Sequence, residues 1–175
     1  KAIKNYRDIN VDHPHWREYI IEMWEEKLEF IGFENAKIQF SGFWSQGDGA
    51  SFTADVDILK VINHMIYCHR DNLTEKDIVV YEKLMLFAEE DLIEATLNRI
   101  NSRYSHERTC TIDIIDHSYS YHDLINKMVS DFEAELDDLR VDLCHAIYKD
   151  LETELGGCTS DEMVAETLKI NEYWF

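Results

Sequence analysis

The sequence has little proline and little cysteine. A single proline, Pro14, occurs in 175 residues, so almost nothing interrupts long helices, and no Pro-, Gly- or Ser-rich linker divides the chain. The four cysteines (Cys68, Cys110, Cys144 and Cys158) form no CxxC pair and lack the density of a small disulfide scaffold. This usage favours a reducing compartment.

Long apolar runs are absent as well. No stretch approaches the roughly 18 apolar residues of a membrane span, and the first residues show no charged-then-apolar leader. We therefore expect a soluble, cytoplasmic protein with no membrane partner.

Basic residues are scarce relative to acidic ones. The chain carries 17 Lys and Arg against 36 Asp and Glu, a formal charge of −19. Such a field repels phosphates, which argues against direct binding of nucleic acid or of anionic membranes. With 45% apolar residues, the chain nevertheless has enough apolar surface to fold as one domain, residues 1–175.

Apolar residues recur every three or four positions over most of the chain, which predicts five helices. Three of them have a predicted cap. Asp57 opens one helix, Thr74 with Asp77 forms a capping box for the next, and Thr159 with Glu162 forms one for the last. The expected helices run from Pro14 to Gly32, from Asp57 to about Arg70, from Thr74 to about Arg103, from Tyr121 to Leu155 before Gly156-Gly157, and from a Thr159–Glu162 capping box towards Tyr173.

Apolar and polar residues alternate in three shorter segments, which predicts strands. Residues 38–44 and 52–56 flank a loop with Gly47 and Gly49 and indicate a β-hairpin. Residues 108–115 alternate again and are expected to pair with this hairpin. The predicted fold class is therefore α+β, mostly helical, with about five helices and a small three-stranded antiparallel sheet.

The hairpin loop has two interpretations. In one, the glycines shape the turn, Asp48 bonds the loop backbone, and Trp44 and Phe52 fill the core. In the other, Phe43, Trp44 and Gln46 are exposed at the hairpin tip and anchor a partner, since aromatic side chains supply much of the energy of protein interfaces.

The longest predicted helix carries a ladder of carboxylates. Asp131, Glu135, Asp138 and Asp142 fall at i, i+4, i+7 and i+11, which places them along one stripe. Like charges at this spacing cost the helix a few tenths of a kcal/mol each, roughly, so they do not serve helix stability. The stripe is either an ordinary solvated face or a surface that imitates a phosphate backbone and binds a basic partner.

Metal sites are a weaker alternative. His64, Cys68 and His69 lie on one predicted helix and Cys144 and His145 on another, a spacing that is unspecific for zinc. Four aspartates lie on or beside the predicted strands, namely Asp48, Asp55, Asp57 and Asp113. They are candidate ligands for Mg²⁺, which clustered carboxylates hold in metal-dependent nucleases. The chain has no GxSxG elbow and no Gly-rich phosphate loop that opens a helix, so we expect no catalytic residues, no bound metal and no cofactor.

Three segments resemble parts of small uncharacterised acidic proteins encoded by bacteriophages. They are the string SGFWSQGDGASF at residues 41–52, the sequence Tyr104-Ser105-His106-Glu107 before a strand, and the closing TSDEMVAETLKINEYWF. The resemblance implies a phage or prophage setting but no activity.

These observations favour a non-enzymatic binding protein that blocks a host defence protein with a basic surface, as anti-restriction and anti-CRISPR proteins do. The expected partner-binding residues are Asp131, Glu135, Asp138 and Asp142, together with Phe43, Trp44 and Gln46. A small metal-dependent hydrolase and an acidic antitoxin-like regulator are the alternatives, and a homodimer is compatible with the same patterns.

Overall fold

The computed structural model describes residues 2–12, 15–100, 103–117 and 123–171. Pro14, Tyr121 and Tyr173, which the sequence analysis uses, lie outside these ranges. The chain divides into two units, one made of residues 1–24 and 146–175 and the other of residues 25–145.

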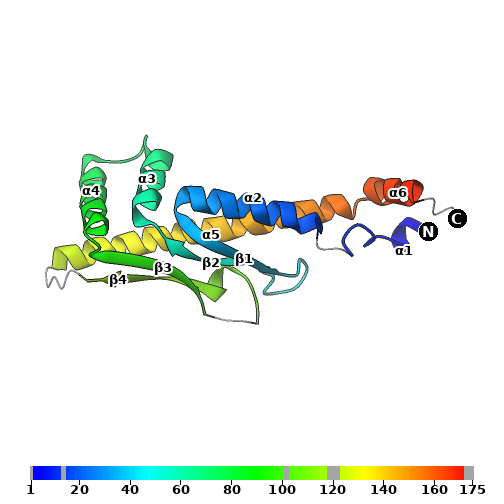
Figure 1. Ribbon diagram of the computed structural model, residues 1–175, viewed down its shortest axis with the longest axis horizontal. Coiled ribbons are helices and arrows are strands. Elements are labelled where there is room, and N and C mark those ends of the chain that lie inside the picture. The colour runs from blue at the N-terminus through cyan, green and yellow to red at the C-terminus, as the bar shows by residue number, and fades with distance from the viewer. Residues whose placement is uncertain (1, 13–14, 101–102, 118–122, 172–175) are drawn as a thin grey trace. The chain divides into compact units, whose positions relative to one another are not determined.

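The described residues include six α-helices and four strands, in an α+β arrangement (Figure 1). The helices are α1 (Ala2–Asn5), α2 (His15–Ile31), α3 (Ile58–His69), α4 (Glu75–Glu89), α5 (Asp123–Cys158) and α6 (Asp161–Ile170). The strands are β1 (Phe33–Ser41), β2 (Gly49–Val56), β3 (Ile93–Arg99) and β4 (Cys110–Asp116). A short 3₁₀ helix, η1 (Glu107–Thr109), leads into β4.

The four strands form one antiparallel sheet in the order β1-β2-β3-β4. Along β3, Ile93, Ala95 and Leu97 are buried while Glu94 and Asn98 are exposed. This alternation is typical of an antiparallel sheet that covers the core with one face and meets water with the other. In Figure 1, α3 and α4 lie side by side.

The prediction of three strands and of a helix continuing to about Arg103 is wrong. Helix α4 ends at Glu89, and Asp91 has a positive φ of 53°, which turns the chain into β3. The four-residue spacing from Ala88 to Leu92 fits a helix, and no Gly or Pro marks the turn. The apolar periodicity therefore predicted a helix that was too long. As a result β4 pairs with β3 and not with the hairpin.

Two local predictions on helices are confirmed. Asp57 caps α3 through its carboxylate, which accepts the amide of Lys60. Thr74 and Asp77 form the expected capping box of α4, and these hydrogen bonds lower the pKa of Asp77. The polar capping residues therefore determine where both helices begin.

The end of α5 differs from the prediction. Gly156 and Gly157 are helical, and α5 ends only at Cys158. Ser160, not Thr159, caps α6 by accepting the amide of Met163. The Thr159 hydroxyl instead donates to the carbonyl of Leu155, one turn earlier. The short helix α1 is a sixth helix that the apolar pattern did not indicate.

In the unit of residues 1–24 and 146–175, a few polar contacts tie segments that are far apart in sequence. Asn10 donates to the carbonyl of Cys158 at 2.9 Å and accepts the hydroxyl of Thr167 at 2.8 Å. The indole of Trp24 donates to Asp150 at 3.0 Å. These bonds hold the first and last parts of the chain together.

Candidate functional site

The predicted stripe lies on an exposed face of α5. Asp131, Glu135, Asp138 and Asp142 are all exposed. The opposite face buries a row of apolar side chains, namely Phe132, Leu136, Leu143 and Ile147. Helical periodicity therefore separates the carboxylates from the core and holds them on a rigid element.

The members of the stripe differ in their partners. Lys127 pairs with Asp131 at 2.7 Å, and the Tyr81 hydroxyl donates to Glu135 at 2.8 Å. Burial, followed by this hydrogen bond, raises the pKa of Tyr81 well above its usual value. Within the described part of the chain, Asp138 and Asp142 take part in no ion pair or side-chain hydrogen bond.

Three stripe residues open onto a cleft of about 490 Å³ formed by α3, α4 and α5. Its titratable lining residues are His64, Cys68, His69, Asp77, Tyr81, Glu135, Asp138 and Asp142. Asp131 is not among them. Four carboxylates and no Lys or Arg side chain face this cleft, so it attracts cations and repels phosphates.

Two imidazoles share the cleft with the carboxylates. Partial burial, together with the nearby charge of His69, lowers the pKa of His64. His64 is therefore neutral at pH 7, and the cleft keeps its negative charge.

The residues considered for zinc do not come together. His64 Nε2 and Cys68 Sγ lie 3.5 Å apart on α3. Cys144 is instead buried beside Cys110, and His145 faces Glu107 at 3.8 Å. In the described residues, no group of three or more His, Cys, Asp or Glu side chains is arranged to hold a metal ion.

The four aspartates considered for Mg²⁺ have separate structural partners. Asp55 accepts the amide of Asn35 at 2.8 Å, and Asp113 accepts that of Asn98 at 3.2 Å. Asp57 caps α3, and Asp48 binds the hairpin loop. The structure therefore offers no support for the metal-dependent hydrolase.

The hairpin loop is held by its own aspartate. The Asp48 carboxylate accepts the backbone amides of Trp44 and Ser45 at 2.7 and 2.5 Å, as predicted. Gly42 and Gly47 adopt φ values of +50° and +99°, which favour glycine. The loop conformation thus depends on the residue types of the GFWSQGDG segment.

The aromatic residues of the loop divide between core and surface. Phe52 is buried and meets the Phe33 ring edge-on, with ring centroids 5.3 Å apart. Of the two interpretations of the loop, the one in which Trp44 fills the core is wrong, because 85% of this residue is exposed. Gln46 is also exposed, and Phe43 is half-buried against Phe40.

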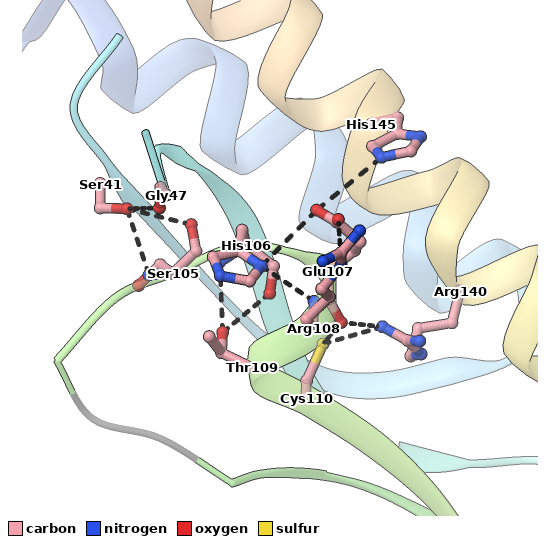
Figure 2. Close-up of polar contacts among 10 residues, drawn as sticks. All are labelled: Ser41, Gly47, Ser105, His106, Glu107, Arg108, Thr109, Cys110, Arg140 and His145. Carbon is pink, nitrogen blue, oxygen red and sulfur yellow. Dashed lines mark hydrogen bonds and ion pairs between the residues drawn. The ribbon is translucent and has the colours of Figure 1, made fainter. Parts of the chain in front are cut away.

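Close contact with residues 105–109 fixes the base of the hairpin (Figure 2). The Ser41 hydroxyl donates to the carbonyl of Ser105 and accepts its amide, both at 3.2 Å. A side chain at Gly49 would collide with His106, so only glycine allows this approach. Two of the strings noted in the sequence, at residues 41–52 and 104–107, therefore meet in space.

A buried arginine beside a cysteine pair escaped the sequence analysis. Arg140 is 5% exposed, and its Nε donates to Asp137 at 2.7 Å. Its Nη1 donates to the carbonyl of Glu107 and lies 3.4 Å from Cys110 Sγ (Figure 2). The signal was present, since Arg140 follows Leu136 by four residues and so occupies a position in the apolar row of α5.

The pKa values of the two cysteines beside Arg140, Cys110 and Cys144, are shifted in opposite directions. A hydrogen bond from the Cys144 thiol and the adjacent Arg140 guanidinium lower the pKa of Cys110 to about 6. The same hydrogen bond, with burial, raises the pKa of Cys144 far above its usual value. Arg140 therefore favours ionisation of Cys110 over that of Cys144.

Comparison with protein families assigns the chain. The family model for the domain of unknown function DUF8835 matches residues 16–161. The chain belongs to the DUF8835 family. The match extends from α2 to the first residue of α6, so it includes the stripe, the cleft and the hairpin loop. No curated protein and no solved structure matches the chain.

No helix of the described residues is both long enough and apolar enough to cross a membrane.

Proposed function

We propose that this DUF8835 protein is a non-enzymatic binding protein of a bacteriophage or related mobile element. It occupies the basic surface of a host protein that handles nucleic acid, such as a defence protein, and blocks it stoichiometrically. The carboxylates of α5 take the place of phosphates in that surface, which makes the protein a nucleic-acid mimic.

The observation that carries this proposal is that two carboxylates of the stripe are exposed without an ion-pair partner among the described residues. Asp138 and Asp142 are exposed, lie one turn apart and have no ion-pair partner among the described residues. With a rise of about 1.5 Å per residue, successive stripe carboxylates are spaced by roughly 4.5 to 6 Å along the helix axis. A basic groove meets them as a row of fixed negative charges.

The net charge supports the same function. A charge of −19 opposes compaction of the chain, yet it speeds association with a basic surface and suppresses contact with nucleic acid itself. Binding of this kind weakens steeply with ionic strength, because salt screens the charges on both partners.

Affinity purification from host cells at low and high salt tests the proposal. The native protein should retain a basic partner at low salt and release it at high salt. A variant with all four stripe residues changed to Lys should retain no partner at either salt concentration. The affinity of the recovered partner, titrated across salt concentrations, should fall steeply.

A matched control separates the stripe from the overall charge. Changing four exposed glutamates elsewhere, Glu22, Glu82, Glu89 and Glu90, to Lys alters the net charge equally. This control should lose far less affinity than the stripe variant. Equal losses, or an affinity that does not change with salt, would contradict mimicry by the stripe.

The hairpin tip is a second proposed contact, with Trp44, Phe43 and Gln46 as its residues. Trp44→Ala should weaken partner binding while the Tm stays nearly constant, since the indole is 85% exposed. Full binding by this variant would remove the tip from the interface and leave the stripe in place.

A further inference from the structure

An apolar groove of about 450 Å³ lies beside the acidic cleft. Its lining residues are Phe30, Lys60, Asn63, His64 and Tyr67. Phe30 is 84% and Tyr67 79% exposed, although both rings are large and apolar over most of their surface. Paired exposed aromatics beside a groove are typical of surfaces that bind a partner.

The polar residues of the groove are already engaged. Lys60 Nζ lies 2.5 Å from Glu34 and 3.5 Å from Asp57, so its charge is neutralised. The Asn63 side chain donates to the carbonyl of Leu59 within α3 at 2.8 Å. What the groove offers a ligand is therefore mainly the two aromatic rings.

The groove and the cleft are adjacent hollows on the two sides of α3. His64 lines both, with Tyr67 on the groove side and Cys68 on the cleft side. A segment that crosses α3 at His64 thus meets aromatic rings on one side and the carboxylates of Asp138 and Asp142 on the other. Neither hollow suits an anionic ligand.

We propose that the groove and the cleft together form one docking surface for a basic, partly apolar segment of the partner protein. A large apolar side chain of that segment lies between Phe30 and Tyr67, and a neighbouring Lys or Arg enters the cleft. This inference rests on the proposed function and names the part of the partner that is recognised.

Charge complementarity selects this occupant. The cleft carries four carboxylates, so it favours guanidinium and ammonium groups and excludes nucleic acid. A second copy of this chain, with its own charge of −19, is repelled as well. The apolar groove adds what charge alone lacks, a contribution to the affinity that salt does not screen.

A labelled synthetic peptide of Leu, Trp, Lys and Arg serves as the probe, with binding to the full chain followed by fluorescence anisotropy. One control peptide has Ser in place of Leu and Trp, and another has Glu in place of Lys and Arg. The first peptide should bind, the serine peptide should bind only at low salt, and the glutamate peptide should not bind.

Variants assign the contacts to the two hollows. Phe30→Ser with Tyr67→Ser should weaken binding about tenfold or more at high salt, as expected for truncated hot-spot aromatics. Asp138→Asn with Asp142→Asn should weaken it mainly at low salt. Tyr19→Ser, which removes another exposed aromatic ring (70% exposed), is the matched control and should bind like the native chain.

The outcomes separate this inference from the proposed function. If the groove variant binds like the native chain while the cleft variant is weakened, the docking surface is wrong and binding by charge stands. If the native chain binds the peptide of Leu, Trp, Lys and Arg and the serine peptide equally at all salt concentrations, the groove has no role and the inference is overturned. Failure of the stripe variant to lose the cellular partner overturns the proposed function itself.

Discussion

Charged side chains on two faces of α5 differ in burial and in pairing. On one face of α5, Arg140 is buried and contacts Asp137, the Glu107 carbonyl and Cys110. On another, Asp138 and Asp142 are exposed, and no ion pair reaches either of them from the described residues. The two sets of charges are only two residues apart in sequence.

This difference separates a charge that serves the fold from charges that are free to bind. A buried cation is tolerated only when every donor has a partner, because desolvation of an ion costs several kcal/mol, roughly, in a protein interior. An exposed carboxylate needs no partner for stability. Substitutions on the two faces should therefore affect different properties.

The largest expected effect is on stability, at the buried face. Arg140→Met removes the donor to the Glu107 carbonyl and the cation beside Cys110. Loss of one member of a buried charge pair costs about 3 kcal/mol or more, which lowers the Tm by roughly 6 to 12 °C for a chain of this size. Thermal unfolding followed by circular dichroism measures the change.

The matched variant is Asp137→Asn, which keeps an oxygen for Arg140 Nε on a half-exposed side chain. It should shift the Tm much less than Arg140→Met. Equal Tm values for native protein and Arg140→Met would show that this centre is not structural, and the contrast between the two faces would fail.

An intermediate effect is expected from pH. The pKa of Cys110 is lowered from 9.0 to about 6 in the folded chain, so its ionisation stabilises the fold fully above about pH 9. This contribution is lost as pH falls from about 9 through about 6. The slope is at most about 1.4 kcal/mol per pH unit.

Urea unfolding of the native chain and of Cys110→Ser between about pH 6 and about pH 8.5 measures this contribution. The native chain should gain stability relative to the variant as pH rises. Cys68→Ser, which removes an exposed thiol, should follow the native chain. A difference that is constant across this range would mean that Cys110 does not ionise beside Arg140.

The smallest effect is expected at the exposed face. Asp138→Asn with Asp142→Asn removes like charges one helical turn apart, so the free energy of unfolding should stay constant or rise by a few tenths of a kcal/mol, roughly. Thermal unfolding at low and high salt checks this. A loss of more than about 1 kcal/mol, beyond what surface substitutions usually cause, would make these carboxylates part of the fold.

Local polar signals made much of the fold predictable. The caps at Asp57 and at Thr74 with Asp77 act within a single turn, so their residues alone determine where α3 and α4 begin. The hairpin was recognisable because its loop carries glycines at positive φ and an aspartate that accepts loop amides. The stripe was readable because helical periodicity fixes which residues share a face.

The features that were missed depend on contacts distant in sequence. Strand β3 lacks Gly or Pro at its start, and only pairing with β2 and β4 decides that residues 93–99 are extended. The cleft requires α3 and α4 to lie beside α5, which no local pattern specifies. Arg140 was not singled out because its partners at residues 107 and 110 lie far from it in sequence.

The glycine pair inside α5 has a consequence for local opening. Gly156 and Gly157 remain helical although no heavy atom lies near enough to contact an added Cβ, so neither glycine is required there by packing. Each costs the helix about 1 kcal/mol relative to alanine. Backbone amides of this last turn should therefore exchange with deuterium well before those between Leu136 and Ile147, and α5 should unwind from its C-terminal end.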